Sequence, residues 1–480
     1  MSRRVIALVA AVAVALLSVG AVLILRGGGD DTSDQRPATR PQGQGRAEAL
    51  AYAPKTTPVL VGVDSGSPAA GLVLGQLVPR LTNGALSASD IAPLLGNEAV
   101  VAMLDTRTQR AQLSFVAKTQ DDLRALTNRL DRTSTYKGAQ LYRGPQGSAV
   151  ATRGSEVVAA TDEPTVRRAL DTRDNPTAHF TPQEFDRRLA GLGTRAPVRT
   201  IFDPRLLLRS RLPEALNTNW GRALTNGAAV LTSSDDGLLV PFKLQTDPNR
   251  LTNADLPFAT GSQPPQIRGQ APLLIGVRDL APTIRFLRRV DPDRFGGIDA
   301  LQRDLPGFLR IDIDGLFSGL RNDGTISSTD RLDHLVLRTD PRDPGDWRRP
   351  LERLSGLSNV LQNLGIDNVK LDEEPGDAYR LTVDGQMVFR AGVFGRTLVY
   401  TDDPRAGLRG AARAAPAPTP AGAAGAVTLR LTRREVRALI VDQFGLPPEA
   451  GLILDRLGDL TGWARSERDG LTGELRLAVR

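Results

Sequence analysis

A run of 21 uncharged, mostly apolar residues at Val5–Leu25 constrains this chain more than any other feature of its sequence. As a helix the run would extend about 32 Å, which matches a hydrocarbon core of ~30 Å. Arg3 and Arg4 precede it, so the positive-inside rule keeps residues 1–4 in the cytoplasm and exports everything that follows. We therefore predict a single-pass cell-membrane protein with its transmembrane anchor at 5–25 and its bulk extracytoplasmic.

A cleaved signal peptide is the alternative interpretation of the same run. Its apolar region would normally be ~7–15 residues long and end at an Ala-x-Ala-like site. Here the longer run ends at Leu23–Arg26 without such a pattern. Residues 27–52 are rich in Gly, Asp, Gln, Pro and Arg and show no apolar periodicity. They predict a disordered tether with a reach of roughly 25–30 Å.

Composition narrows the chemistry that the chain can support. The chain has no cysteine, which excludes disulfides, thiolate metal sites and cysteine nucleophiles. Only two histidines are present, His179 and His334, which disfavours histidine-rich metal sites and most histidine acid–base schemes. The net charge is +7, but the basic residues are interleaved with Asp and Glu, so we do not expect nucleic acid as a partner.

Two parts of the chain repeat one plan. The β-rich segment Pro58–Asp64 has a counterpart in Pro272–Arg278, with Gly at the same place, and a helical stretch follows each. Each copy also ends on two β-rich runs separated by Asp-Gly, at Asp236-Gly237 and at Asp469-Gly470. Such a pair of runs predicts a hairpin with a tight turn.

The clearest match between the copies is a strand-to-helix junction. Thr161–Pro164 reads Thr-Asp-Glu-Pro and Thr401–Pro404 reads Thr-Asp-Asp-Pro. In such a sequence a Thr or Asp side chain caps the new helix and Pro occupies an early helical position where its missing N–H costs nothing. Capping explains Asp162 and Asp402 without a catalytic role. Asp203 and Thr432 are predicted to cap later helices in the same way.

The repeat predicts the domain organisation and the fold class. We expect two homologous α+β domains, at 53–247 and 271–480, each with a largely antiparallel sheet packed by helices. Residues 248–270, which contain Pro264-Pro265, would link them. The Ala/Pro/Gly-rich stretch Ala411–Ala426 would be a flexible excursion within the second domain.

No catalytic, cofactor-binding or metal site is predicted, because the usual phosphate-loop, dinucleotide, nucleophile-elbow and zinc-helix motifs are missing. Ser65 and Ser67 follow the first strand but lack the elbow motif, so we interpret them as loop residues. The acidic groups that resemble metal or sugar-transfer sites have simpler explanations as loops, turns or solvated strand faces. They are Asp291, Asp293 and Asp299; Asp312 and Asp314; and Asp372–Glu374, which we interpret as a charged turn.

The arrangement resembles a family of bacterial proteins of unknown function that is common in actinobacteria. The features that carry the resemblance are the strand at Ala53–Val63 and the Thr-Asp-acid-Pro junctions at 161–164 and 401–404. The resemblance implies an N-terminal membrane anchor, a disordered tether and an exported α+β region. It implies no catalytic residues and no cofactor.

Two functional hypotheses follow. The favoured one is a non-catalytic, membrane-tethered binding or scaffold protein of the cell envelope, whose partner would be a lipid, a wall polymer or another envelope protein. The alternative is a carboxylate-dependent envelope hydrolase. A deep apolar cavity would favour a lipid ligand, whereas two carboxylates converging across a cleft would favour the hydrolase.

Overall fold

The structure is a computed structural model, which describes residues 45–65, 67, 78, 91–105, 110–211, 213–234, 237–290, 315, 319–320, 322–328, 334–352, 355, 369–375, 378–383, 385–444 and 457–479. The anchor predicted at 5–25 and residues 27–44 of the predicted tether lie outside these residues. Among the residues described, no helix is long and apolar enough to cross a membrane.

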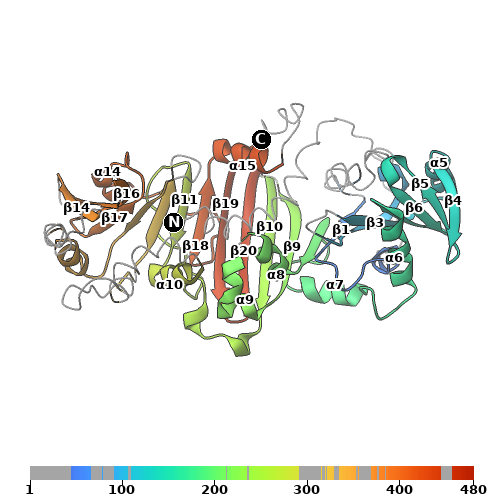
Figure 1. Cartoon of the computed structure of the whole chain (residues 1–480), viewed down its shortest axis with the longest axis horizontal. Helices are drawn as coiled ribbons and strands as arrows, with labels where there is room; N and C mark the ends of the chain where they lie inside the picture. Colours follow the sequence, from blue (N-terminus) through green and yellow to red (C-terminus); the bar gives the residue numbers. More distant parts are fainter. Residues whose placement is uncertain are drawn as a thin grey trace.

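One antiparallel sheet of 20 strands runs through the part of the chain that the structure describes (Figure 1). The first half (residues 45–247) supplies β1 Val59–Asp64, β2 Leu95–Met103, β3 Ala111–Ala117, β4 Asp131–Tyr136, β5 Ala139–Arg143, β6 Ala149–Arg153, β7 Glu156–Ala160, β8 Val198–Phe202, β9 Leu224–Ser234 and β10 Gly237–Thr246. The second half (residues 263–479) supplies β11 Leu273–Val277, β12 Gly324–Ser328, β13 Val336–Thr339, β14 Val369–Glu374, β15 Ala378–Val383, β16 Gln386–Phe394, β17 Thr397–Thr401, β18 Val427–Leu431, β19 Leu457–Glu467 and β20 Gly470–Val479.

The strand order is the same in the two halves. The first half runs from the edge inward as β4-β5-β6-β7-β3-β2-β1-β8-β9-β10. The second half runs as β14-β15-β16-β17-β13-β12-β11-β18-β19-β20. The prediction of an α+β fold with largely antiparallel pairing is therefore confirmed, while the division into two domains stays a prediction.

The two halves meet where β10 pairs with β20, so they share one continuous sheet. Leu244 lies opposite Leu471, and Phe242 lies opposite Gly473. A Cβ at Gly473 would lie 2.6 Å from the Phe242 ring, so this position needs glycine for the ring to pack. The predicted hairpin at the end of the chain is present, with Glu467 paired to Gly470.

Helices pack on both faces of the sheet. The core face carries α5 Gln120–Thr127, α8 Pro204–Arg211, α9 Asn219–Ala223, α10 Leu280–Val290 and α15 Arg433–Phe444. The outer face carries α2 Arg46–Leu50, α6 Glu163–Arg173, α7 Pro182–Leu189 and α14 Leu408–Ala412. Short 3₁₀ turns lie at Ala92–Leu94, Pro145–Gly147, Pro213–Asn217, Pro248–Arg250 and Asn253–Asp255.

The hydrophobic core of the core face crosses from one half to the other. Trp220 on α9 is 1% exposed and meets Phe286 on α10 edge to face, with 5.7 Å between the ring centroids. Residues 248–270, predicted as a linker, contribute to this packing because Leu251, Leu256 and Phe258 are buried. Burial of these apolar side chains on the core face holds the two halves against each other.

The helix caps follow the sequence only in part. Asp162 caps α6 as predicted, because its Oδ1 accepts a hydrogen bond of 2.7 Å from the Thr165 N–H. Asp402 caps no helix; its Oδ1 accepts a hydrogen bond of 2.6 Å from the Leu335 N–H. At the start of α15 the Arg433 N–H donates to Asp459 Oδ1 at 2.9 Å, a contact in which the predicted cap Thr432 has no part.

Two segments that were predicted to be flexible have an ordered structure instead. Residues 45–52 of the predicted tether form α2 and bury Ala49–Tyr52, because this short apolar run fits against β2 and β3. The predicted excursion Ala411–Ala426 is also ordered, since it pairs with the entry segment of the second half through a bridge between Arg268 and Pro416. Pro54 and His179 form the corresponding bridge in the first half.

Candidate functional site

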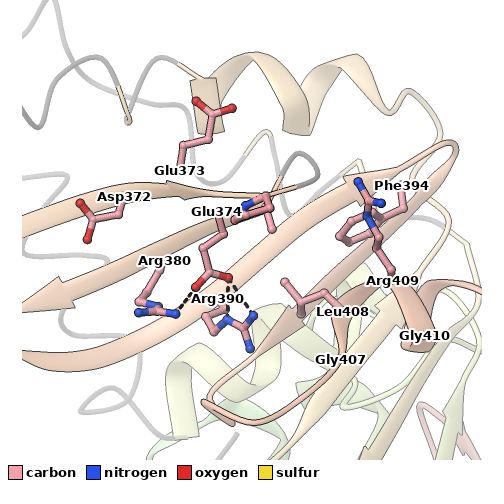
Figure 2. Close-up of a pocket in the computed structure, with 12 residues that line it drawn as sticks. Asp372, Glu373, Glu374, Arg380, Arg390, Phe394, Gly407, Leu408, Arg409 and Gly410 are labelled. Atoms are coloured by element: carbon pink, nitrogen blue, oxygen red, sulfur yellow. Dashed lines mark hydrogen bonds and ion pairs between the residues drawn. The ribbon is translucent and has the colours of Figure 1, made fainter.

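The candidate site is a cavity of about 550 Å³ on the outer face of the second half. Its walls come from the end strands β14, β15 and β16 and from the short helix α14 (Figure 2). In Figure 1 this end of the molecule lies opposite the end that carries β4 and α5. The lining residues are Asp372, Glu373, Glu374, Pro375, Ala378, Arg380, Arg390, Phe394, Gly407, Leu408, Arg409 and Gly410.

A cluster of three charged side chains forms the floor of the cavity. The strand register places Arg380 directly between Asp372 and Arg390, and Glu374 is two residues from Asp372 on the same face. Arg390 donates from Nε to Glu374 Oε2 at 2.8 Å, and its Nη2 lies 2.8 Å from the same oxygen. Arg380 forms an ion pair with the other oxygen of Glu374. Both oxygens of this carboxylate are therefore engaged by arginine.

Arg390 also holds open the loop that precedes α14. Its Nη1 donates to the carbonyl oxygens of Pro404 and Ala406, at 3.1 and 2.9 Å. In an α-helix these carbonyls would accept from the N–H groups of residues 408 and 410. Gly407 and Gly410 lower the helix propensity further, by about 1 kcal/mol each relative to Ala. Thr401–Pro404 therefore starts no helix, and α14 begins only at Leu408.

Three other charged groups at the cavity have no partner among the described residues. Within the part of the chain that the structure describes, Asp372, Glu373 and Arg409 make no side-chain hydrogen bond or ion pair, and all three are exposed. Figure 2 shows Asp372 at one end of the cluster and Arg409 at the other, beside Phe394, while Glu373 points away from the floor. These groups are free to meet a ligand.

The same face of the first half is sealed. There the 11-residue helix α6 packs Val166, Ala169 and Leu170 onto β5, β6 and β7, and Tyr52 completes the cover. Ten residues of this cluster are buried, against three in the cluster under α14 (Ala378, Val399 and Leu408). The strands explain the difference, because β5 and β6 carry Leu141 and Ala151 on this face whereas β15 and β16 carry Arg380 and Arg390.

The sequence indicated part of this site, but with another structure. Asp372–Glu374, interpreted as a charged turn, forms the end of the edge strand β14, and the turn follows at Pro375. Arg380, Arg390 and Arg409 were missed. The available signal was an Arg in each of two strands whose counterparts in the first copy are apolar on the covered face.

The other candidates from the sequence do not join this site. Ser65 donates to the Gly96 carbonyl, and Ser67 donates to the Asp64 carbonyl at 2.9 Å, as loop residues do. His179 lies 3.0 Å from the Phe180 carbonyl through Nδ1, and His334 lies 3.9 Å from Asp402. The remaining acidic candidates lie outside the described residues: Asp291, Asp293, Asp299, Asp312 and Asp314. No group of three metal-ligating side chains occurs among the described residues.

Comparison with known proteins does not identify a family or a function for this chain. No protein-family model matches the chain, and no curated protein matches it. Among solved structures, crystal form III of TP0453 matches with a TM-score of 0.29 and 15% identity, over 41% of this chain and 79% of that one. Crystal form IV of TP0453 matches with a TM-score of 0.29 and 16% identity, over 41% and 80%. Matches this distant assign no function.

Proposed function

We propose that this protein is a non-catalytic, membrane-tethered binding protein of the cell envelope, and that the cavity beside α14 is its ligand site. One observation carries the proposal. The two halves have the same strand order, but among the described residues the outer face is covered by apolar packing in the first half and is open and lined by charged side chains in the second. Sealing a face stabilises a fold, whereas an open face with unpaired charges gains nothing until a ligand covers it.

The geometry supports binding better than hydrolysis. Glu374 has both oxygens engaged by Arg380 and Arg390, so this carboxylate is not free to attack or to transfer a proton. Glu373 neighbours Glu374 along β14, and successive strand residues point to opposite faces. Among the described residues that line the cavity, there is therefore no pair of converging free carboxylates of the kind that glycoside hydrolysis requires.

The charged lining also disfavours a lipid carrier. Six of the lining residues are charged: Asp372, Glu373, Glu374, Arg380, Arg390 and Arg409. An acyl chain buried among them would desolvate these charges without pairing them, which is costly. A polar ligand or a segment of another envelope protein fits this lining better.

The location in the proposal rests on the N-terminal sequence. The apolar run Val5–Leu25 follows Arg3 and Arg4, and the first described helix starts at Arg46. The intervening 26–44 would hold the folded part within about 25 Å of the membrane if it behaves as a flexible chain. N-terminal sequencing of membrane-extracted protein tests this, since a mature chain starting after Leu25 would mean a secreted protein.

The binding site is tested by filling the cavity. Gly410 lines it, and a Cβ there meets nothing within 4 Å, so Gly410→Trp introduces a bulky ring without a backbone clash. The matched control is Arg168→Trp on the exposed side of α6, the helix that covers the first half. Native mass spectrometry of the full-length proteins in detergent should show a recurrent small-molecule adduct on the wild type and the control. Loss of that adduct only in Gly410→Trp supports the site; an adduct retained in all three, or found in none, contradicts it.

A further inference from the structure

We infer that the cavity binds a short peptide through both of its free ends, with the amino group beside Asp372 and the carboxylate beside Arg409. The inference rests on the proposed function and specifies its ligand. It starts from the separation of unpaired charge across the cavity. Asp372 lies on the edge strand and Arg409 lies on α14, with the ion-paired floor between them (Figure 2).

The floor between these two charges is already balanced. Glu374 is 12% exposed and Arg390 is 16% exposed; they pair through Oε2 of Glu374, and Arg380 forms an ion pair with Oε1. Arg390 Nη1 also donates to the carbonyls of Pro404 and Ala406. A ligand group above this floor therefore needs no charge of its own. Glu373 points away from the floor, so the unpaired charges beside it are Asp372 and Arg409 at its two ends. A small zwitterion has this distribution of charge.

The walls suit a peptide more than other zwitterions. Ala378, Phe394 and Leu408 supply apolar surface against which small side chains can pack. A volume of about 550 Å³ is in the usual range for a small ligand.

The test measures the affinity of the full-length protein in detergent micelles for three probes by isothermal titration calorimetry. The probes are tetra-alanine with free ends, N-acetyl tetra-alanine and tetra-alanine amide. Each blocked peptide loses one charge-assisted contact, so it should bind about tenfold more weakly than the free peptide.

Two variants assign each end of the peptide to its residue. In Asp372→Asn, the free and N-acetylated peptides should bind equally, because the partner of the amino group is gone. In Arg409→Gln, the free peptide and the amide should bind equally for the corresponding reason. Asp131→Asn on the edge strand of the first half and Arg405→Gln in the turn before α14 are the matched controls. Both wild-type side chains are exposed and lie outside the cavity, so neither change should alter the three affinities.

Three results would overturn the inference: no binding of tetra-alanine, equal affinity for the free and blocked peptides, or unchanged discrimination in both cavity variants. The adduct experiment separates this failure from failure of the proposed function. An adduct lost in Gly410→Trp together with no binding of tetra-alanine means that the cavity takes a ligand of other chemistry. No Gly410-dependent adduct and no peptide binding would remove both proposals.

Discussion

The outer faces of the two halves are built on strands in the same order, yet the first is covered by a helix and the second is open to solvent. In the first half α6 lies along β6 and β7 and buries an apolar cluster. In the second half the equivalent junction stays open, and α14 has only five residues. The difference originates in the strands beneath, where Arg390 binds the carbonyls that a longer helix would use.

This comparison shows that a helix-capping sequence allows a helix to start but does not ensure that one forms. Thr161–Pro164 and Thr401–Pro404 share the residues that favour a capped helix, and both follow a strand. Asp162 caps α6 because the apolar residues after it can bury themselves on β6 and β7. Asp402 instead binds the Leu335 N–H, since the residues after it include Gly407 and Gly410 and face a charged floor.

The largest effect on stability is expected from truncating a buried leucine, and it can be compared between α6 and α14. Leu170 is 1% exposed in the cluster of ten buried residues, so Leu170→Ala should lower the free energy of unfolding by about 3 kcal/mol. Leu408 is also buried, at 4% exposed, but its cluster holds only three buried residues, so Leu408→Ala should cost less, about 2 kcal/mol. Urea unfolding of the full-length proteins, followed by tryptophan fluorescence, measures both values. Equal costs would mean that the two faces are packed alike.

An intermediate effect is expected at the charged floor. Arg390→Met leaves Glu374 with Arg380 alone and leaves the carbonyls of Pro404 and Ala406 without their donor, which should cost about 2 kcal/mol. Amide hydrogen exchange over residues 404–412 should accelerate as well. Arg380→Met is the control and should cost less, because Arg380 is 47% exposed. If the two variants behave alike, Arg390 does not hold the loop open.

The smallest expected effect concerns α7, which has no helical counterpart in the described residues of the second half. Lys55, and then the Thr181 N–H, lower the pKa of Glu184 to about 2. Because the folded pKa is below the unfolded value of ~4.3, this stabilisation is present above pH 4.3 and is lost as the pH falls through about 2. Solvent screening should keep it below about 1 kcal/mol.

Glu184→Gln tests this dependence, since the amide can keep the capping contacts but not the ion pair with Lys55. The difference in unfolding free energy between pH 6 and pH 2.5 should be smaller in the variant than in the wild type. An unchanged difference would assign the acid sensitivity of the first half to other carboxylates, such as Asp171, whose pKa is lowered chiefly by Lys137.

Local patterns predicted the elements better than their assembly. The β-rich segments Pro58–Asp64 and Pro272–Arg278 predicted β1 and β11, and the helical stretch expected after the second segment is α10. The apolar run Ala49–Tyr52 was assigned to the tether, because its burial depends on β2 and β3, which come more than 40 residues later in the chain. The same limit applies to the continuous sheet, since the β10–β20 pair joins segments more than 200 residues apart.

By itself, the sequence determined the α+β class, the repeated order of elements, the Asp162 cap and the hairpin that ends the chain, because each depends on residues close together along the chain. Only the tertiary structure decided that one outer face is sealed and the other open. Glu374 and Arg390 are 16 residues apart, and the strand register brings them within 2.8 Å. Arg390 then reaches the loop before α14, a contact that no local pattern specifies.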